Sequence, residues 1–197
     1  MRQARSGLDR APITHYLNLM NLNTQNLYDI INVPDPVLKQ IAQPVENIDS
    51  DIQKQMDRML QTMYDAPGIG LAANQVGLLN RVLVMDLSRR DEEEEPTPIC
   101  MANPQILWES EEMSVMEEGC LSIPKQYADV ERPATVRVKY TDYHGKEAEL
   151  EASGLLSHCV QHEIDHLNGV LFIDYLSSLK RNMILRKVEK MKKQNII

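Results

Sequence analysis

Two histidines lie four residues apart in the segment His162-Glu163-Ile164-Asp165-His166. On a helix this spacing projects both imidazoles from one face, so that they can bind the same metal ion. Glu163 lies about 100° further around the helix axis, where its carboxylate can reach a water on the ion without being a ligand itself. The pattern therefore predicts a hydrolytic metal centre, and its alternative is a chance match or a pair of core histidines.

A hydrolytic metal site also needs a third protein ligand and an open position. The residues that follow His166 contain no histidine at the spacing of the zinc peptidases. Asp174 and Glu189 fall in an expected apolar strand and an expected basic helix, so the better candidate lies upstream. Cys120 stands between a glycine and a proline-terminated segment, at a strand or loop edge from which its thiolate could face the helix. One cysteine with two histidines suits Zn²⁺ or Fe²⁺ and not Mg²⁺ or Ca²⁺, whereas a lone cysteine can equally be a small buried hydrophobe.

A third motif runs from Gly68 to Gly77 and combines glycines, small side chains and the amide of Gln75. Such a segment can pass close to a ligand, expose backbone groups and direct Gln75 at a developing oxyanion. The alternative is a turn at the C-terminal end of a helix that leads into a strand at Val82, with Gln75 in solvent.

Length and composition favour one folded domain. The chain has 197 residues, of which 43% are hydrophobic and 25% charged, close to the average for globular proteins. It has three cysteines, a number that suits a reducing compartment better than a disulfide framework. No apolar run approaches a bilayer span, and residues 1–26 lack the apolar stretch of a secretory signal. We therefore expect a soluble intracellular protein with no membrane partner and a flexible extension over residues 1–26.

The charge is unevenly distributed along the chain. The net charge is −8, which excludes a generally basic nucleic-acid-binding surface. Between Leu179 and Lys193, however, seven basic residues accompany the single acid Glu189. This positive segment on an acidic protein predicts a separate electrostatic task, and its alternative is a solvated helix face. The acidic run from Asp91 to Glu95 is expected to be an exposed loop.

Periodicity and turn residues predict an α+β fold with mixed, mainly antiparallel sheets packed around a central metal-binding helix, followed by a C-terminal helix. Helices are expected from Asp49 or Ser50 to the glycines after Pro67, from Ser153 to Asn168, and from Tyr175 to Lys193, the last with an apolar stripe that includes Leu179, Met183, Ile184 and Val188. Strands are expected at 82–87, 105–109, 112–116, 128–131, 135–141, 146–151 and 171–173, the fifth and sixth as a hairpin.

Three blocks of this sequence resemble the signature motifs of the peptide deformylase family. They are Gly68 to Gly77, Glu118 to Pro124, and Gln161 to Gly169 with Phe172. The likeness extends from about Leu27 to Val188. It implies a single catalytic domain over 27–197.

The resemblance implies a role for each matching residue. Cys120, His162 and His166 would bind one divalent metal, with Fe²⁺ as the physiological ion and Zn²⁺, Ni²⁺ or Co²⁺ as other ions that this ligand set accepts. Glu163 would be the general acid and base, and Gln75 with the backbone N–H of Leu121 would form the oxyanion hole. Substrate would be held by Ile69, Gly70, Gly119, Leu155 and Cys159. His158 departs from the aliphatic residue common in the family, and we interpret it as a satisfied surface or core histidine.

The resemblance further implies that N-formylmethionyl nascent polypeptides are the substrates, in the bacterial cytoplasm. It also implies that the basic helix from Arg181 to Lys193 contacts the ribosome through ribosomal RNA. Two alternatives stay open from the residues alone. One is a metal-dependent peptidase that cleaves internal peptide bonds. The other is a noncatalytic ribosome-tethering protein with a structural metal.

Overall fold

A computed structural model describes residues 27–88 and 96–197 of the chain. The predicted extension over residues 1–26 and the acidic run from Asp91 to Glu95 lie outside this description. The elements run in the order η2 (Pro36–Lys39), α2 (Ser50–Asp65), β1 (Gly70–Ala72), η3 (Ala73–Val76), β2 (Val82–Met85), β3 (Ile99–Glu109), β4 (Met113–Cys120), β5 (Ile123–Pro133), β6 (Thr135–Thr141), β7 (Glu147–Ser153), α3 (Leu155–Leu167), η4 (Phe172–Tyr175) and α4 (Ser178–Lys193).

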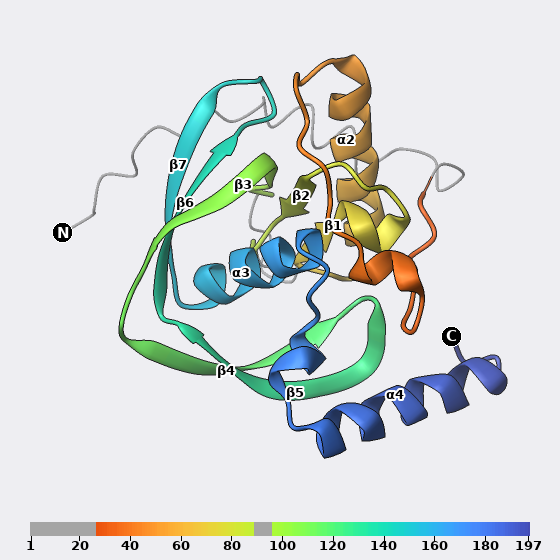
Figure 1. Cartoon of the computed structure of the whole chain (residues 1–197). Helices are drawn as coiled ribbons and strands as arrows, with labels where there is room; N and C mark the ends of the chain where they lie inside the picture. The colour runs from red at the N-terminus through yellow and green to blue at the C-terminus, as the bar shows by residue number, and fades with distance from the viewer. Residues whose placement is uncertain (1–26, 89–95) are drawn as a thin grey trace.

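Two antiparallel sheets enclose the helix α3. One sheet has the strand order β1-β2-β3-β6-β7, and the other consists of β4 and β5. Figure 1 shows α3 lying between the two sheets, with α2 and α4 on the outside. This arrangement confirms the α+β architecture with a central helix.

The central position of α3 follows from its apolar residues. Val160, Ile164 and Leu167 are buried against the larger sheet in a cluster that also contains Leu83 and Val138. The helix begins after Gly154, whose φ of 58° is a conformation that favours glycine. Because α3 is covered on several sides, its polar residues face an enclosed site instead of open solvent.

The helix α2 and the strand hairpin form as their local sequences predict. Asp49 caps α2 by accepting hydrogen bonds from the backbone N–H groups of Asp51 and Ile52. Strands β6 and β7 pair from Thr135 opposite Ser153 to Thr141 opposite Glu147, which confirms the expected hairpin. These elements fix the larger sheet on which α3 packs.

Several expected strands have other boundaries. The strand expected at 105–109 is the end of β3, which begins at Ile99, and irregularities in its register accompany its path toward β4 (Figure 1). The strand expected at 112–116 is β4, which extends to Cys120. The strand expected at 128–131 is β5, which begins at Ile123. The strand expected at 171–173 is wrong, because this segment leads into the 3₁₀ helix η4, whose N-terminus is held by a hydrogen bond from the Leu171 N–H to Asp174.

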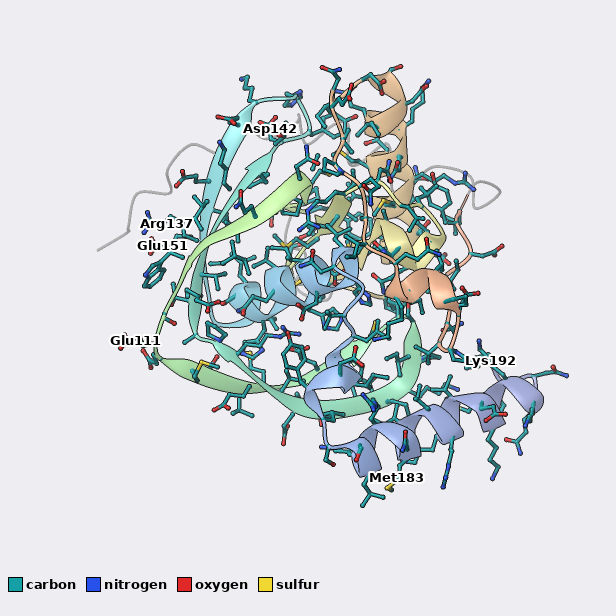
Figure 2. The ribbon with its side chains drawn as sticks, in the orientation of Figure 1. Glu111, Arg137, Asp142, Glu151, Met183 and Lys192 are labelled. Atoms are coloured by element: carbon teal, nitrogen blue, oxygen red, sulfur yellow. The ribbon has the colours of Figure 1, made fainter. Side chains whose placement is uncertain are left out.

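The C-terminal helix α4 begins at Ser178, after the cap residue Ser177, and not at Tyr175. Ile184 and Val188 are buried against β5 and η4, as the predicted stripe requires. Leu179 and Met183 were expected in the same stripe, but they are 73% and 51% exposed. Figure 2 shows Met183 on the outer side of α4. The face of α4 that packs against the protein is therefore narrower than predicted. Among the described residues, no helix combines the length and apolar character needed to cross a membrane.

Candidate metal centre

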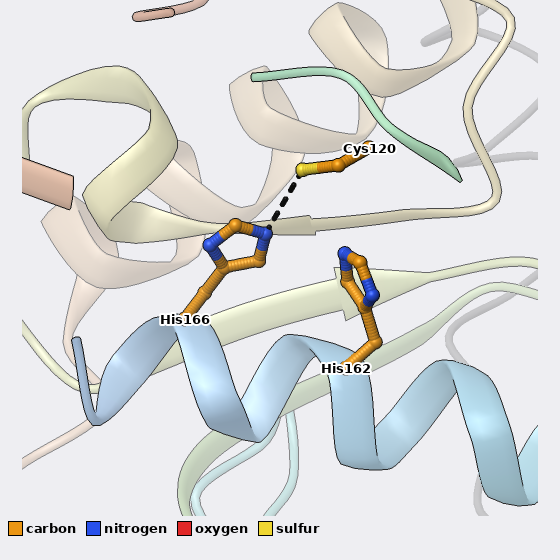
Figure 3. A group of neighbouring side chains, drawn as sticks. All are labelled: Cys120, His162 and His166. Carbon is orange, nitrogen blue, oxygen red and sulfur yellow. Dashed lines mark hydrogen bonds between the residues drawn. The ribbon is translucent and has the colours of Figure 1, made fainter. Parts of the chain in front are cut away.

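The structure brings Cys120, His162 and His166 together (Figure 3). Cys120 is the last residue of β4, and the two histidines are one turn apart on α3. One ligand atom from each side chain lies within 4.8 Å of the other two, and Cys120 Sγ is 3.2 Å from His166 Nε2. This is the convergence that the sequence predicted. The strand edge directs the sulfur toward the helix.

The ring of His162 is oriented by Glu118. His162 Nδ1 is 2.9 Å from Glu118 Oε2, and because a carboxylate only accepts, Nδ1 carries the proton. The other ring nitrogen, Nε2, is then the one left to face a metal ion. Glu118 and Cys120 are two residues apart on β4 and share one face of the strand. A carboxylate-histidine pair of this kind would orient and strengthen a metal ligand.

The sequence did not reveal that Glu118 orients His162, or that Arg132 is the partner of Glu118. Arg132 Nε donates to Glu118 Oε1 at 2.6 Å, and Nη2 donates to Oε2 at 3.0 Å. Burial alone would raise the pKa of Glu118, but the hydrogen bonds from His162 and Arg132 outweigh it and hold the pKa at about 2. Glu118 is therefore ionised at neutral pH. The signal in the sequence was the alternation of β4, which places residue 118 on the same face as residue 120.

The carboxylate of Glu163 lies against Gly70. A Cβ atom on residue 70 would be 2.8 Å from Glu163 Cδ, so that only glycine leaves room for the carboxylate there. Glu163 Oε2 is buried and has no hydrogen-bond partner among the described residues. Burial raises the pKa of Glu163 to about 7, because desolvation disfavours the charged form. A carboxyl group with this pKa can both accept and donate a proton near neutral pH.

Gln75 is buried, and the alternative that placed it in solvent is wrong. Its Oε1 accepts a hydrogen bond of 2.8 Å from the backbone N–H of Ala72. Its Nε2 then points toward Ser122 Oγ, at 3.2 Å, and Cys120 Sγ, at 3.5 Å. The short strand β1 and the turn η3, which the sequence analysis did not separate, fix this orientation. The amide N–H groups are thus presented to the metal centre.

A cleft of about 400 Å³ opens over these groups. Its lining includes Ile69, Gly70, Gln75, Gly119, Cys120, Leu121, His162 and Glu163. A smaller pocket of about 100 Å³ adjoins it, and its lining includes Ile69, Met116, Leu155, His158, Cys159 and His162. All the residues predicted to hold substrate therefore line one of these two spaces.

His158 is 2% exposed and is a satisfied core histidine, in agreement with its interpretation from the sequence. Its Nδ1 is 3.1 Å from Glu118 Oε1, and its Nε2 is 2.8 Å from Ser114 Oγ. The contact with Glu118 places it beside the residue that orients His162.

The donors fit a divalent transition metal. A thiolate and two imidazoles form a ligand set of the kind used by Zn²⁺ and Fe²⁺. Glu163 Oε2, which has no hydrogen-bond partner within residues 27–88 and 96–197, adds a proton acceptor in the same cleft. Burial lowers the pKa of His166 well below its ordinary value, which keeps this imidazole neutral and available as a ligand. The site thus offers three candidate ligands and an open side toward the cleft.

The sequence matches one protein family over most of its length. The family model for polypeptide deformylase covers residues 27–182. The peptide deformylase of Rhizobium meliloti (strain 1021) is 58% identical over 161 residues, which are 82% of this chain and 91% of the relative. The peptide deformylase of Mesorhizobium japonicum (strain LMG 29417 / CECT 9101 / MAFF 303099) is 58% identical over 164 residues, 83% of this chain and 92% of the relative.

Solved structures agree with the sequence match. A crystal structure of peptide deformylase from Ehrlichia chaffeensis superposes with a TM-score of 0.82 at 40% identity, covering 87% of this chain and 99% of the other. A crystal structure of the Ehrlichia chaffeensis protein in complex with actinonin gives a TM-score of 0.79 at 42% identity, with 84% and 98% covered. Similarity therefore extends through both the sheets and the helix α3.

Proposed function

The chain belongs to the polypeptide deformylase family, and we propose that it hydrolyses the N-formyl group of formylmethionine at the start of newly made proteins and releases formate. The observation that carries the proposal is the joint placement of Cys120, His162, His166 and Glu163 around one cleft in a chain of this family. The bacterial relatives support a bacterial cytoplasmic setting.

We assign the metal ligands as Cys120, His162 and His166. A divalent ion held there, with Fe²⁺ as our physiological assignment, would supply an electrophile for the formyl oxygen and would lower the pKa of water. His162 is held in its ligating orientation by Glu118, whose charge is fixed by Arg132. These contacts keep the ligand from rotating when the cleft is open.

Glu163 transfers the proton in this proposal. Its carboxylate takes a proton from the attacking water and later gives it to the departing amine of methionine. The pKa of about 7 and the absence of a competing partner for Oε2 among the described residues support both steps. Gly70 keeps the carboxylate in this position, because any side chain there would displace it.

The negative oxygen that forms on the formyl carbon needs hydrogen-bond donors. We assign this role to the Nε2 amide of Gln75 and the backbone N–H of Leu121, both of which line the cleft. Because the backbone N–H of Ala72 holds the other end of the Gln75 amide, Nε2 is already directed toward this side of the cleft before the reaction. Removal of one such donor typically costs about 3 kcal/mol of transition-state stabilisation.

The adjoining pocket is our assignment for the methionine side chain. Leu155 and Cys159 form one wall of it, and Cys159 Sγ donates to the Ile69 carbonyl at 3.7 Å. Ile69 and Gly119 line both spaces, and we assign them the role of holding an extended substrate backbone. Gly70 completes this wall of the cleft.

One experiment separates this proposal from an internal peptidase and from a noncatalytic protein. Protein purified without oxygen is given a formyl-Met tripeptide, its acetyl analogue and an unblocked longer peptide. We expect formate and one new amine from the first substrate only, with one metal equivalent bound. New amines from the longer peptide, or no turnover by metal-loaded protein, would contradict the proposal. Cys120→Ala is expected to lose the metal and the activity together.

We further propose that α4 contacts the ribosome through its basic side chains. Lys192 turns back to the protein, where Nζ donates to the Asn32 carbonyl at 3.0 Å, and Lys193 pairs with Glu189 at 2.8 Å. Lys180, Arg186, Lys187 and Lys190 are exposed. These four residues are the available cations.

The test is salt-dependent cosedimentation with ribosomes. The variant R186Q/K187Q/K190Q is compared with K54Q/R137Q/K146Q, which removes the same charge from exposed residues elsewhere. We expect the first variant to bind more weakly and with a smaller salt slope, and the control to bind like wild type. Equal binding by both variants would contradict this role of α4.

A further inference from the structure

Both ring nitrogens of the buried His158 have polar partners. Nδ1 lies 3.1 Å from Glu118 Oε1, which can only accept, so Nδ1 donates. Nε2 lies 2.8 Å from Ser114 Oγ, whose hydroxyl can donate to it. Ser114 and Glu118 both belong to β4, and His158 belongs to α3. The ring therefore connects the two elements that carry the metal ligands.

Glu118 uses its full acceptor capacity. Its two oxygens accept from Arg132 Nε at 2.6 Å, Arg132 Nη2 at 3.0 Å, His158 Nδ1 at 3.1 Å and His162 Nδ1 at 2.9 Å. A carboxylate offers about four lone-pair positions, and here each oxygen has two donors. Loss of the His158 donor would leave Oε1 held by Arg132 alone, in a site where Glu118 is 7% exposed. An unfilled acceptor there destabilises the carboxylate and removes one of the three side chains that fix its orientation.

We propose that His158 is a positioning residue that fixes the Glu118 carboxylate and, through it, the metal-ligating ring of His162. Ser114 holds His158 in the tautomer that donates to Glu118. The inference rests on the proposed function, because it assumes that His162 binds the metal.

The ring of His158 also lines the small pocket beside Leu155 and Cys159. A substitution at residue 158 therefore changes both the pocket wall and the hydrogen bonds of Glu118. Ser114 is not part of the pocket lining. Its hydroxyl can be removed without altering the wall, so Ser114→Ala isolates the hydrogen-bond network from the substrate contact.

The test uses three variants and one control of the full chain. His158→Leu removes both hydrogen bonds. His158→Asn retains a donor, Nδ2, at the position of Nδ1, and Ser114→Ala removes only the far partner. Ser153→Ala, on the exposed face of β7, is the matched control. The measurements are the release rate of Co²⁺ to a chelator, the visible spectrum of the Co²⁺ protein, and kcat and KM for a formyl-Met peptide.

We expect His158→Leu to release Co²⁺ about tenfold faster, at the lower end of the effect of losing an outer-shell partner, and to shift the Co²⁺ bands. Ser114→Ala should change the same two readouts in the same direction and to a smaller extent, with KM unchanged. His158→Asn should restore most of the wild-type release rate.

Two results would overturn the inference. One is a release rate and spectrum like those of wild type in both His158→Leu and Ser114→Ala. The other is a change confined to KM in the residue-158 variants, which would make His158 a pocket wall only. Failure of the proposed function itself would instead appear in the wild-type protein, as absent metal or absent turnover.

Discussion

Replacement of Arg132 by leucine removes the charge that balances Glu118. Arg132 is 2% exposed, donates twice to Glu118, and donates to Asp165 Oδ2 at 2.7 Å. Leucine would occupy part of the volume but would leave both carboxylates without their cation. Breaking a buried ion pair in this way typically costs about 3–5 kcal/mol, because one charge stays buried and unpaired.

The pKa of Glu118 gives a second value for the stability that its partners contribute. Its partners hold it at about 2, against an ordinary value of 4.5. At about 1.4 kcal/mol for each pH unit, the folded state favours the charged form by roughly 3 kcal/mol. Because the folded pKa is the lower one, this contribution is present above pH 4.5 and is lost as the pH falls toward 2. His162 supplies part of this contribution and Arg132 the rest. From the loss of the buried ion pairs with Glu118 and Asp165 we expect Arg132→Leu to lower the free energy of unfolding by about 3 kcal/mol at pH 7, and by progressively less in acid.

The assay is urea unfolding of the metal-free protein at several pH values. Arg137→Leu is the matched control, since Arg137 is exposed on the neighbouring strand β6 (Figure 2). The double variant Arg132→Leu with Glu118→Gln should recover part of the loss, because no unpaired carboxylate remains at residue 118. A loss below about 1 kcal/mol at pH 7, or one that does not shrink in acid, would refute the reasoning.

Two further outcomes are expected. Gly70→Ala should lower kcat/KM about 100-fold, because the new Cβ displaces the Glu163 carboxylate, while the protein still binds one metal equivalent. Metal analysis and kinetics on the same samples check this, and unchanged kinetics would contradict it. In metal-free protein, the raised pKa of Glu163 should make wild type lose roughly 3 kcal/mol of stability relative to Glu163→Gln as the pH rises from 4.5 through 7, since the neutral carboxyl is the form that folding favours. Urea midpoints across this range measure the difference, and a constant difference would show that Glu163 is not buried as described.

The convergence of the two candidate histidine ligands could be predicted because their spacing has a direct geometric meaning. Residues four apart on a helix share a face, so the pair His162 and His166 was readable from the sequence alone. Cys120 was only a candidate, because its distance from the helix depends on where β4 ends. The structure settles this with a sulfur 3.2 Å from His166 Nε2. Local periodicity thus predicts a ligand pair, while a third ligand depends on tertiary packing.

The groups around the ligands were harder to predict. Glu118 and Arg132 are 14 residues apart on two strands, and their pairing depends on the register of β4 against β5. The burial of Gln75 could not be predicted from the sequence, because Gln75 lies in the 3₁₀ turn η3. The strand before this turn has only three residues, too few to show a clear alternation. Such elements are fixed by contacts with the rest of the fold, and their own sequences carry little signal.

The last helix shows the limit of the hydrophobic pattern. Ile184 and Val188 were correctly placed in the docked stripe, whereas Leu179 and Met183 face away from the protein. Met183 lies on the outer side of α4, as Figure 2 shows, although the next residue, Ile184, is buried. Periodicity predicts which residues share a face, but the width of the covering surface decides which of them are buried.

The most direct test of the central claim compares wild type with Glu163→Gln in a single turnover of a formyl-Met peptide, with bound metal measured in the same samples. We predict one metal equivalent in both proteins and formate release slower by about 10²–10⁴-fold in the variant, because the ligands are intact and the proton carrier is absent. Formate release at the wild-type rate by Glu163→Gln, or by protein from which the metal has been stripped, would contradict the account.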